Sequence, residues 1–121
     1  MTGVQTCALP IWQAGILAAA GLIALEEMPA RLAEDHANAR FLAETVAKCP
    51  AAEIDLTAVQ TNIVIFALRR KGDALALVAK LKESGILSSA IGPDHLRLVT
   101  HYDVSREDCD ICAAALVKLL V

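Results

Sequence analysis

Residues 61–68 read TNIVIFAL, and this short run of β-branched, aromatic and aliphatic side chains decides the fold class. It contains almost no polar side chain, which predicts a strand covered on both faces. Arg69, Arg70, Lys71 and Gly72 end the run. The two arginines and the lysine lack aromatic neighbours that could form a groove for nucleic acid, so we interpret the segment as a solvated turn.

Downstream of this strand, turn and capping residues separate one helix from two further strands. Asp73 and Gly85 are placed to cap and to end a helix over residues 74–84, since glycine readily adopts the left-handed conformation that ends helices. Residues 86–91 and 95–101 then have the pattern of two strands around a turn at Gly92-Pro93-Asp94. Their closeness predicts a hairpin.

The C-terminal segment begins with Ser105, followed three positions later by Asp108. In this arrangement the hydroxyl accepts a bond from an unpaired backbone N–H, and the carboxylate lies at the positive end of the helix dipole. The pattern predicts a last helix that runs from here to the C-terminus.

Upstream of residue 61, two segments have helical character. Residues 13–27 predict a first helix, and Pro29 fits the first turn of a second helix over residues 29–48. In this second helix an apolar stripe is expected at Leu32, His36, Ala39 or Arg40, Ala43 and Val46 or Ala47, with Arg31, Glu34, Asp35 and Glu44 on the solvent side. The element order α-α-β-α-β-β-α predicts an α+β domain with a sheet of three strands packed by helices.

Length and composition limit what the chain can be. Its 121 residues suffice for one small domain, and 56% hydrophobic with 21% charged residues excludes disorder. The net charge of -3 provides no basic surface for nucleic acid. Four cysteines are too few for a disulfide framework, and we expect a cytoplasmic protein.

The first 25 residues contain no charged side chain. A secretory signal needs a positive segment before its apolar core, so export is not expected. Two alternatives remain at this point. The segment is a membrane anchor over residues 8–25, or it forms a helix that a larger protein covers on every side.

Arg97 is the candidate site residue. Strand alternation places it with His95, Val99 and His101 on one face, and the neighbouring leucines on the other face. An arginine in the middle of a short strand is a rigid, permanently charged fork that suits a carboxylate. The alternative is an ion pair with a neighbouring acidic side chain.

Other residues suggest weaker hypotheses. Cys109 and Cys112 have a C-x-x-C spacing, and with His95 and His101 they form a hypothetical zinc site. The alternative interpretation is that both cysteines pack in the core as small hydrophobic residues. The consecutive residues Glu26 and Glu27 diverge on a helix, so they are expected at a solvated helix end rather than in acid-base catalysis.

Four ordered blocks resemble a known family. They are residues 13–21 (QAGILAAAG), 31–40 (RLAEDHANAR), 59–64 (VQTNIV) and 95–101 (HLRLVTH). In order and spacing these blocks resemble the C-terminal third of the low-specificity threonine aldolases. These are pyridoxal-phosphate (PLP) enzymes of the aspartate-aminotransferase fold, and the resemblance covers residues 13–121.

The resemblance implies a function and a role for Arg97. The family cleaves threonine and related β-hydroxy-α-amino acids to glycine and an aldehyde, and PLP stores the electron pair released by the breaking bond. By resemblance, Arg97 holds the substrate α-carboxylate. The full-length parent is then expected to bind an amino-acid substrate and PLP, without nucleic acid or membrane, as a homotetramer or homodimer.

The resemblance also implies which parts are missing. The family's Schiff-base lysine, the aromatic residue stacked on the cofactor and the acidic partner of the pyridine nitrogen precede this segment. We therefore expect the chain alone to be inactive and to form no covalent bond with PLP. Residues 1–11 resemble translated sequencing adapter, which predicts a non-native leader over residues 1–12 and an aldolase-like small domain over 13–121, a truncated gene product.

Overall fold

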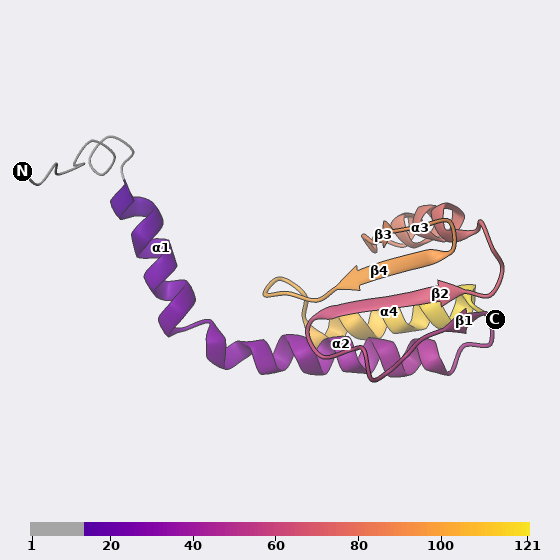
Figure 1. The fold of residues 1–121 in the computed structure, drawn as a ribbon, viewed down its shortest axis with the longest axis horizontal. Helices are drawn as coiled ribbons and strands as arrows, with labels where there is room; N and C mark the ends of the chain where they lie inside the picture. Colours follow the sequence, from indigo (N-terminus) through magenta and orange to yellow (C-terminus); the bar gives the residue numbers. More distant parts are fainter. Residues whose placement is uncertain (1–13) are drawn as a thin grey trace, which may run out of the picture. The chain divides into compact units, whose positions relative to one another are not determined.

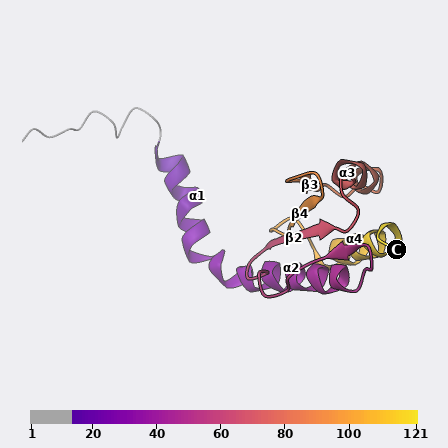
Figure 2. The same cartoon turned by 45° about the vertical axis from the view of Figure 1, so that its right-hand side comes forward.

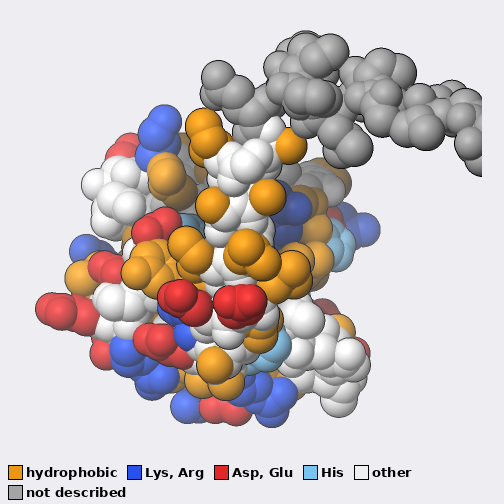
Figure 3. All heavy atoms as spheres, turned by 90° about the vertical axis from the view of Figure 1, so that its left-hand side faces the viewer, with side chains coloured by type: hydrophobic (Ala, Val, Ile, Leu, Met, Phe, Trp, Pro, Cys, Tyr) orange, Lys and Arg blue, Asp and Glu red, His pale blue; other side chains and the backbone are white. Residues whose placement is uncertain are grey.

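The structure is a computed structural model that describes residues 14–121. The chain divides between Leu32 and Ala33 into two units. In the first unit, helix α1 spans Ala14–Glu26 and the 3-10 turn η1 spans Pro29–Arg31. No residue of α1 is buried within the chain, and hydrophobic side chains of this unit lie at the surface in Figure 3.

This exposed helix bears on the anchor hypothesis. Among the described residues, no helix is both long enough and apolar enough to cross a bilayer. The predicted anchor lies partly, and the predicted leader wholly, outside residues 14–121. Pro29 stands in the first turn of η1, as expected, and the α-helical part of the second predicted helix begins at Leu32.

The second unit is a two-layer α+β fold, which confirms the predicted class (Figure 1). Its antiparallel sheet has the order β1-β2-β4-β3. The prediction of three strands was wrong by one, because β1 is only two residues long and has no periodicity to detect. The elements are α2 Leu32–Ala47, β1 Ala52–Glu53, β2 Ile63–Leu68, α3 Ala74–Glu83, β3 Ser89–Ala90, β4 His95–Val99 and α4 Arg106–Leu119.

Strand β2 is covered on one face only, so the prediction of cover on both faces was wrong. Val64, Phe66 and Leu68 are buried. Ile63 and Ile65 point the other way and keep 41% and 45% of their surface exposed. The sheet therefore has an inner face toward the helices and an apolar outer face.

Helices α2, α3 and α4 build the core with the inner face of the sheet (Figures 1 and 2). Each helix contributes a stripe of buried aliphatic or cysteine side chains that meets Val64, Phe66, Leu96 and Leu98. Helices α2 and α4 are also joined where the Arg106 guanidinium lies 3.7 Å from the centre of the Phe41 ring, a favourable cation–π contact.

The buried stripe of α2 differs from the predicted one. Ala39, Ala43 and Val46 are buried as expected. Leu32 is 47% exposed, and Asp35, which was expected on the solvent side, is only 4% exposed. The helix is rotated relative to the expected stripe, because its neighbours in the fold rather than its own pattern determine which face is covered.

The ends of α3 agree with the sequence only in part. Gly85 follows the helix with a φ of +79°, as predicted for a left-handed end. Asp73 stands at the N-cap, but its side chain does not cap the helix. Its carboxylate instead pairs with Arg70, with a distance of 3.3 Å from Nε to Oδ2.

A complete capping box begins α4, as predicted. Ser105 Oγ accepts a bond from the Asp108 N–H at 3.1 Å, and Asp108 Oδ2 accepts one from the Ser105 N–H at 2.9 Å. The hydrogen bonds from Ser105 lower the pKa of Asp108. Both partners are local, which is why the sequence alone identifies this helix start.

We expect Ser105→Ala to lower the free energy of unfolding by about 1 kcal/mol, because it leaves the first turn of α4 without its cap. Urea denaturation followed by circular dichroism measures the change. Ser84→Ala is the matched control, since the Ser84 hydroxyl lies at a helix end, is exposed and caps no N-terminus. Equal losses in both variants would contradict a specific role for the capping box.

Candidate functional site

Arg97 lies at the centre of the outer face of the sheet. Strand β4 alternates between exposed and buried side chains, with Leu96 and Leu98 buried and Arg97 exposed. The register places Arg97 opposite Ile65 of β2 on one side and opposite Ser89 of β3 on the other. The predicted alternation is therefore confirmed, and Arg97 has a strand on each side of it.

Apolar side chains adjoin Arg97 on the β2 side of the outer face, and Ser89 and His95 share that face. Ile63, Ile65 and Val99 share the outer face and are 41%, 45% and 42% exposed. Among residues 14–121, the Arg97 guanidinium has neither an ion pair nor a hydrogen bond. The ion pair that was the alternative is therefore not formed within the described residues.

The two histidines of this region each contact a neighbouring aspartate. His95 Nδ1 lies 2.7 Å from Asp94 Oδ1, and His101 Nδ1 lies 3.6 Å from Asp103 Oδ2. Both histidines are about half-exposed. The Asp94 contact places the imidazole of His95 at the turn end of β4, two residues before Arg97.

Cys109 and Cys112 do not form the hypothetical zinc site with these histidines. No group of three or more metal-binding side chains comes together in the described part of the chain. Both cysteines are buried in the core side of α4. Burial raises the pKa of the Cys109 thiol and raises that of Cys112 to about 11, so both thiols stay protonated at neutral pH and pack as small hydrophobic residues.

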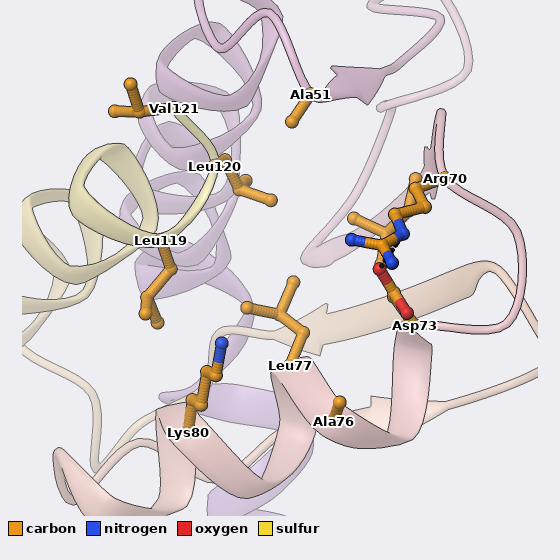
Figure 4. A pocket seen from close by; sticks show the side chains of 10 residues that line it. Ala51, Arg70, Asp73, Ala76, Leu77, Lys80, Leu119, Leu120 and Val121 are labelled. Atoms are coloured by element: carbon orange, nitrogen blue, oxygen red, sulfur yellow. Dashed lines mark ion pairs between the residues drawn. The ribbon is translucent and has the colours of Figure 1, made fainter.

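A surface hollow of about 390 Å³ lies between α3 and the C-terminal end of α4 (Figure 4). Its wall is mainly aliphatic, and Lys80 extends its amine between Leu77 and Leu119. The Arg70 and Asp73 ion pair closes another side. Arg97 does not line this hollow, so the hollow is separate from the candidate carboxylate site.

The described lysines share one kind of environment. All are exposed, and each belongs to a helix or a turn rather than to a strand. A lysine that bonds to PLP must lie in a shielded position beside the cofactor. No reaction step is assigned to these lysines, which are Lys48, Lys71, Lys80, Lys82 and Lys118.

Sequence reasoning missed two polar residues at the other end of β4. The side-chain amide of Asn62 donates a hydrogen bond to the Thr100 carbonyl oxygen at 2.7 Å. The two residues are 38 positions apart in the chain. No local motif announces a pair of this kind, although both residues lie inside the blocks that carry the family resemblance.

Comparison with known proteins identifies the family of the chain. The profile of the Beta-eliminating lyase family matches residues 3–69, more than half of the chain. The chain belongs to the beta-eliminating lyase family. Within it, the low specificity L-threonine aldolase of Escherichia coli K12 is 42% identical over 102 residues, and the probable low-specificity L-threonine aldolase 2 of Arabidopsis thaliana is 31% identical over 109 residues.

These relatives are much longer than the chain. The E. coli match covers 84% of the chain but only 29% of the aldolase, and the Arabidopsis match covers 88% and 31%. The predicted resemblance to low-specificity threonine aldolases is thus confirmed. The chain of this beta-eliminating lyase family member corresponds to less than a third of each relative.

Solved structures agree with the family assignment. The fold matches the cystine C–S lyase C-DES in complex with its product cysteine persulfide, with a TM-score of 0.67 and 28% identity over 86% of this chain and 28% of that one. A C-DES mutant with glycine covalently linked to its PLP cofactor matches with a TM-score of 0.68 and 27% identity. Both structures hold an amino acid, and every amino acid carries an α-carboxylate.

Proposed function

We propose that this chain forms the substrate-carboxylate part of a PLP-dependent lyase that cleaves threonine and related β-hydroxy-α-amino acids to glycine and an aldehyde. In this proposal Arg97 binds the α-carboxylate. The assignment to threonine rather than to a sulfur amino acid follows the higher identity to the aldolases, 42% against 28% for the C–S lyase.

The observation that carries the proposal is the position of the Arg97 guanidinium. It extends from the centre of a sheet, lies among apolar side chains and has no counter-charge within residues 14–121. A guanidinium in this position offers two parallel N–H groups to a carboxylate.

A carboxylate held at two points fixes the orientation of the amino acid attached to it. The backbone of β4 is held between two strands, so Arg97 provides a reference point of low mobility. Orientation of this kind accounts for several kcal/mol of a reaction barrier when the reacting bond must be aligned. Arg97 would therefore contribute to both binding and turnover.

The proposed aldolase function is tested with a chimera. Residues 14–121 replace the matching segment of the E. coli low specificity L-threonine aldolase, and glycine formation from threonine is measured. The proposal expects cleavage well above that of the E. coli protein with the segment deleted. A folded, PLP-containing chimera that does not cleave threonine or other β-hydroxy amino acids would contradict it.

We further expect the isolated chain to form no site-specific Schiff base with PLP, because its lysines are exposed and none is shielded beside a cofactor. The chain is mixed with PLP, treated with borohydride and analysed by intact-mass spectrometry. Only sparse, random labelling of surface lysines is expected, equal to that of the chain unfolded in urea. Stoichiometric labelling of one lysine in the folded chain alone would overturn the expectation.

A further inference from the structure

We propose that Asn62 and Thr100 are positioning residues for Arg97: together they fix the register and the order of β4, and thereby the place of the guanidinium. The functional part of this inference rests on the proposed role of Arg97 in binding the carboxylate. Its structural content, that two polar residues hold β4 in place, is tested independently of that role.

The first argument is the reciprocal bonding of the two residues. The Thr100 N–H donates to the Asn62 carbonyl oxygen at 3.0 Å, and the Asn62 side-chain amide donates to the Thr100 carbonyl oxygen at 2.7 Å. This pair extends the ladder one step beyond the pair Ile63 and Val99. Just before β2, the Asn62 side-chain amide therefore replaces a backbone N–H as the donor to the Thr100 carbonyl oxygen.

The second argument is that Thr100 also connects β4 to the helical layer. Its hydroxyl donates to the Asp35 carbonyl oxygen of α2 at 2.7 Å, and Thr100 is only 1% exposed. A buried hydrogen bond of this kind fixes both groups, since losing it would leave polar atoms without water. One residue therefore holds β4 against both the neighbouring strand and the helix beneath it.

The third argument comes from the opposite end of β4. There the Leu68 N–H donates to the Asp94 carbonyl oxygen at 2.7 Å, and the Ile91 N–H donates to the His95 carbonyl oxygen at 3.0 Å. Within the described residues, the hydrogen bonds that join that end to its neighbouring strands are main-chain bonds. At the end that follows Arg97, side chains of Asn62 and Thr100 add to the main-chain bonds. The register matters for Arg97, because a slip of β4 by one residue would turn its side chain to the inner face.

Ladder alternation also provides a direct probe of the position of Arg97. In antiparallel strands, hydrogen-bonded and non-hydrogen-bonded pairs alternate, and Cα atoms are closer in the non-hydrogen-bonded pairs. Because Asn62 and Thr100 form a bonded pair, Ile65 and Arg97 form a non-bonded one. Their α protons should give a strong nuclear Overhauser effect (NOE).

The experiment uses the full 121-residue chain, labelled for NMR. In Thr100→Val, which removes the hydroxyl but keeps the shape, we expect amide exchange at Leu98 to become about tenfold faster, as for the loss of one buried hydrogen bond. The NOE between Ile65 and Arg97 should weaken, while exchange at Leu116 of α4 stays unchanged. Thr100→Ser, which keeps the hydroxyl, should restore both signals.

A matched control and a second variant complete the test. Thr45→Val removes a hydroxyl that also donates to a helix carbonyl, at 3.0 Å, but within α2 itself; it should leave the signals of β4 unchanged. Asn62→Asp keeps the side-chain shape and removes the donor just before β2, so it should reproduce the effect of Thr100→Val.

Several results would overturn the positioning role. They are an unchanged NOE in Thr100→Val and Asn62→Asp, equal acceleration of amide exchange in β4 and α4, or unfolding of both variants. Unfolding would mean that the two residues stabilise the whole fold rather than position β4. The outcome for the proposed function is separate. A folded, PLP-containing chimera that is inactive, alongside the expected NMR result, would reject the proposed aldolase function and leave the positioning of β4 intact.

Discussion

Replacing Arg97 by alanine in the chimera is expected to lower kcat/KM for threonine about 100-fold, with KM raised and kcat lowered together. Loss of a charge-assisted bidentate contact in an apolar setting costs about 3 kcal/mol. Both constants should change because one group binds the substrate and aligns it. Steady-state kinetics of glycine formation give the two values.

Two further variants make this measurement specific. Arg97→Lys keeps the charge but loses the planar fork, so it should recover only part of the activity. Arg69→Ala removes an exposed arginine just after β2, and it should leave kcat/KM within about twofold of the parent chimera. If Arg97→Ala retained the parental kinetics in a folded chimera, the carboxylate role would be wrong.

Features with a local cause could be predicted from the sequence. The capping box at Ser105 and Asp108 involves residues three positions apart, and Gly85 ends α3 by its own conformational freedom. The exposed position of Arg97 follows from strict alternation with Leu96 and Leu98. In each case the neighbours along the chain determine the geometry, so no knowledge of the tertiary fold was required.

Features that depend on distant partners could not be predicted. Strand β1 has only two residues and exists because β2 pairs with it. Asp35 was expected in solvent because it is charged, yet the packing of α2 buries it beside Thr100, whose hydroxyl bonds to its carbonyl oxygen.

The outer face of the sheet shows the same limit for the candidate site. The apolar run 61–68 suggested cover on both faces, whereas the structure leaves Ile63 and Ile65 about half-exposed around Arg97. The sequence shows that these side chains are apolar, but it does not show which other residues cover them. Likewise, the family resemblance pointed to Arg97, but only the structure reveals the contact between Asn62 and Thr100 that holds its strand.

The largest loss of stability is expected for Phe66→Ala. Phe66 is 1% exposed and is among the largest fully buried side chains of the core, where β2 faces the helices. Removing it loses the transfer free energy of the ring and leaves a cavity, which together cost about 3 to 5 kcal/mol. Domains are typically stable by about 5 to 15 kcal/mol, so this loss is a large fraction of the total and should lower the urea midpoint well below that of the parent chain.

Phe41→Ala provides the matched control for this prediction. Phe41 is only partly buried and packs at the edge of the core beneath the Arg106 guanidinium. Its removal should cost less than half as much as that of Phe66, because solvent can fill the space left and only the cation–π contact and part of the ring's burial are lost. Urea denaturation of the full chain measures both. Equal losses would mean that the core is not centred on β2, and that the sheet carrying Arg97 is not the part of the unit that the helices stabilise most.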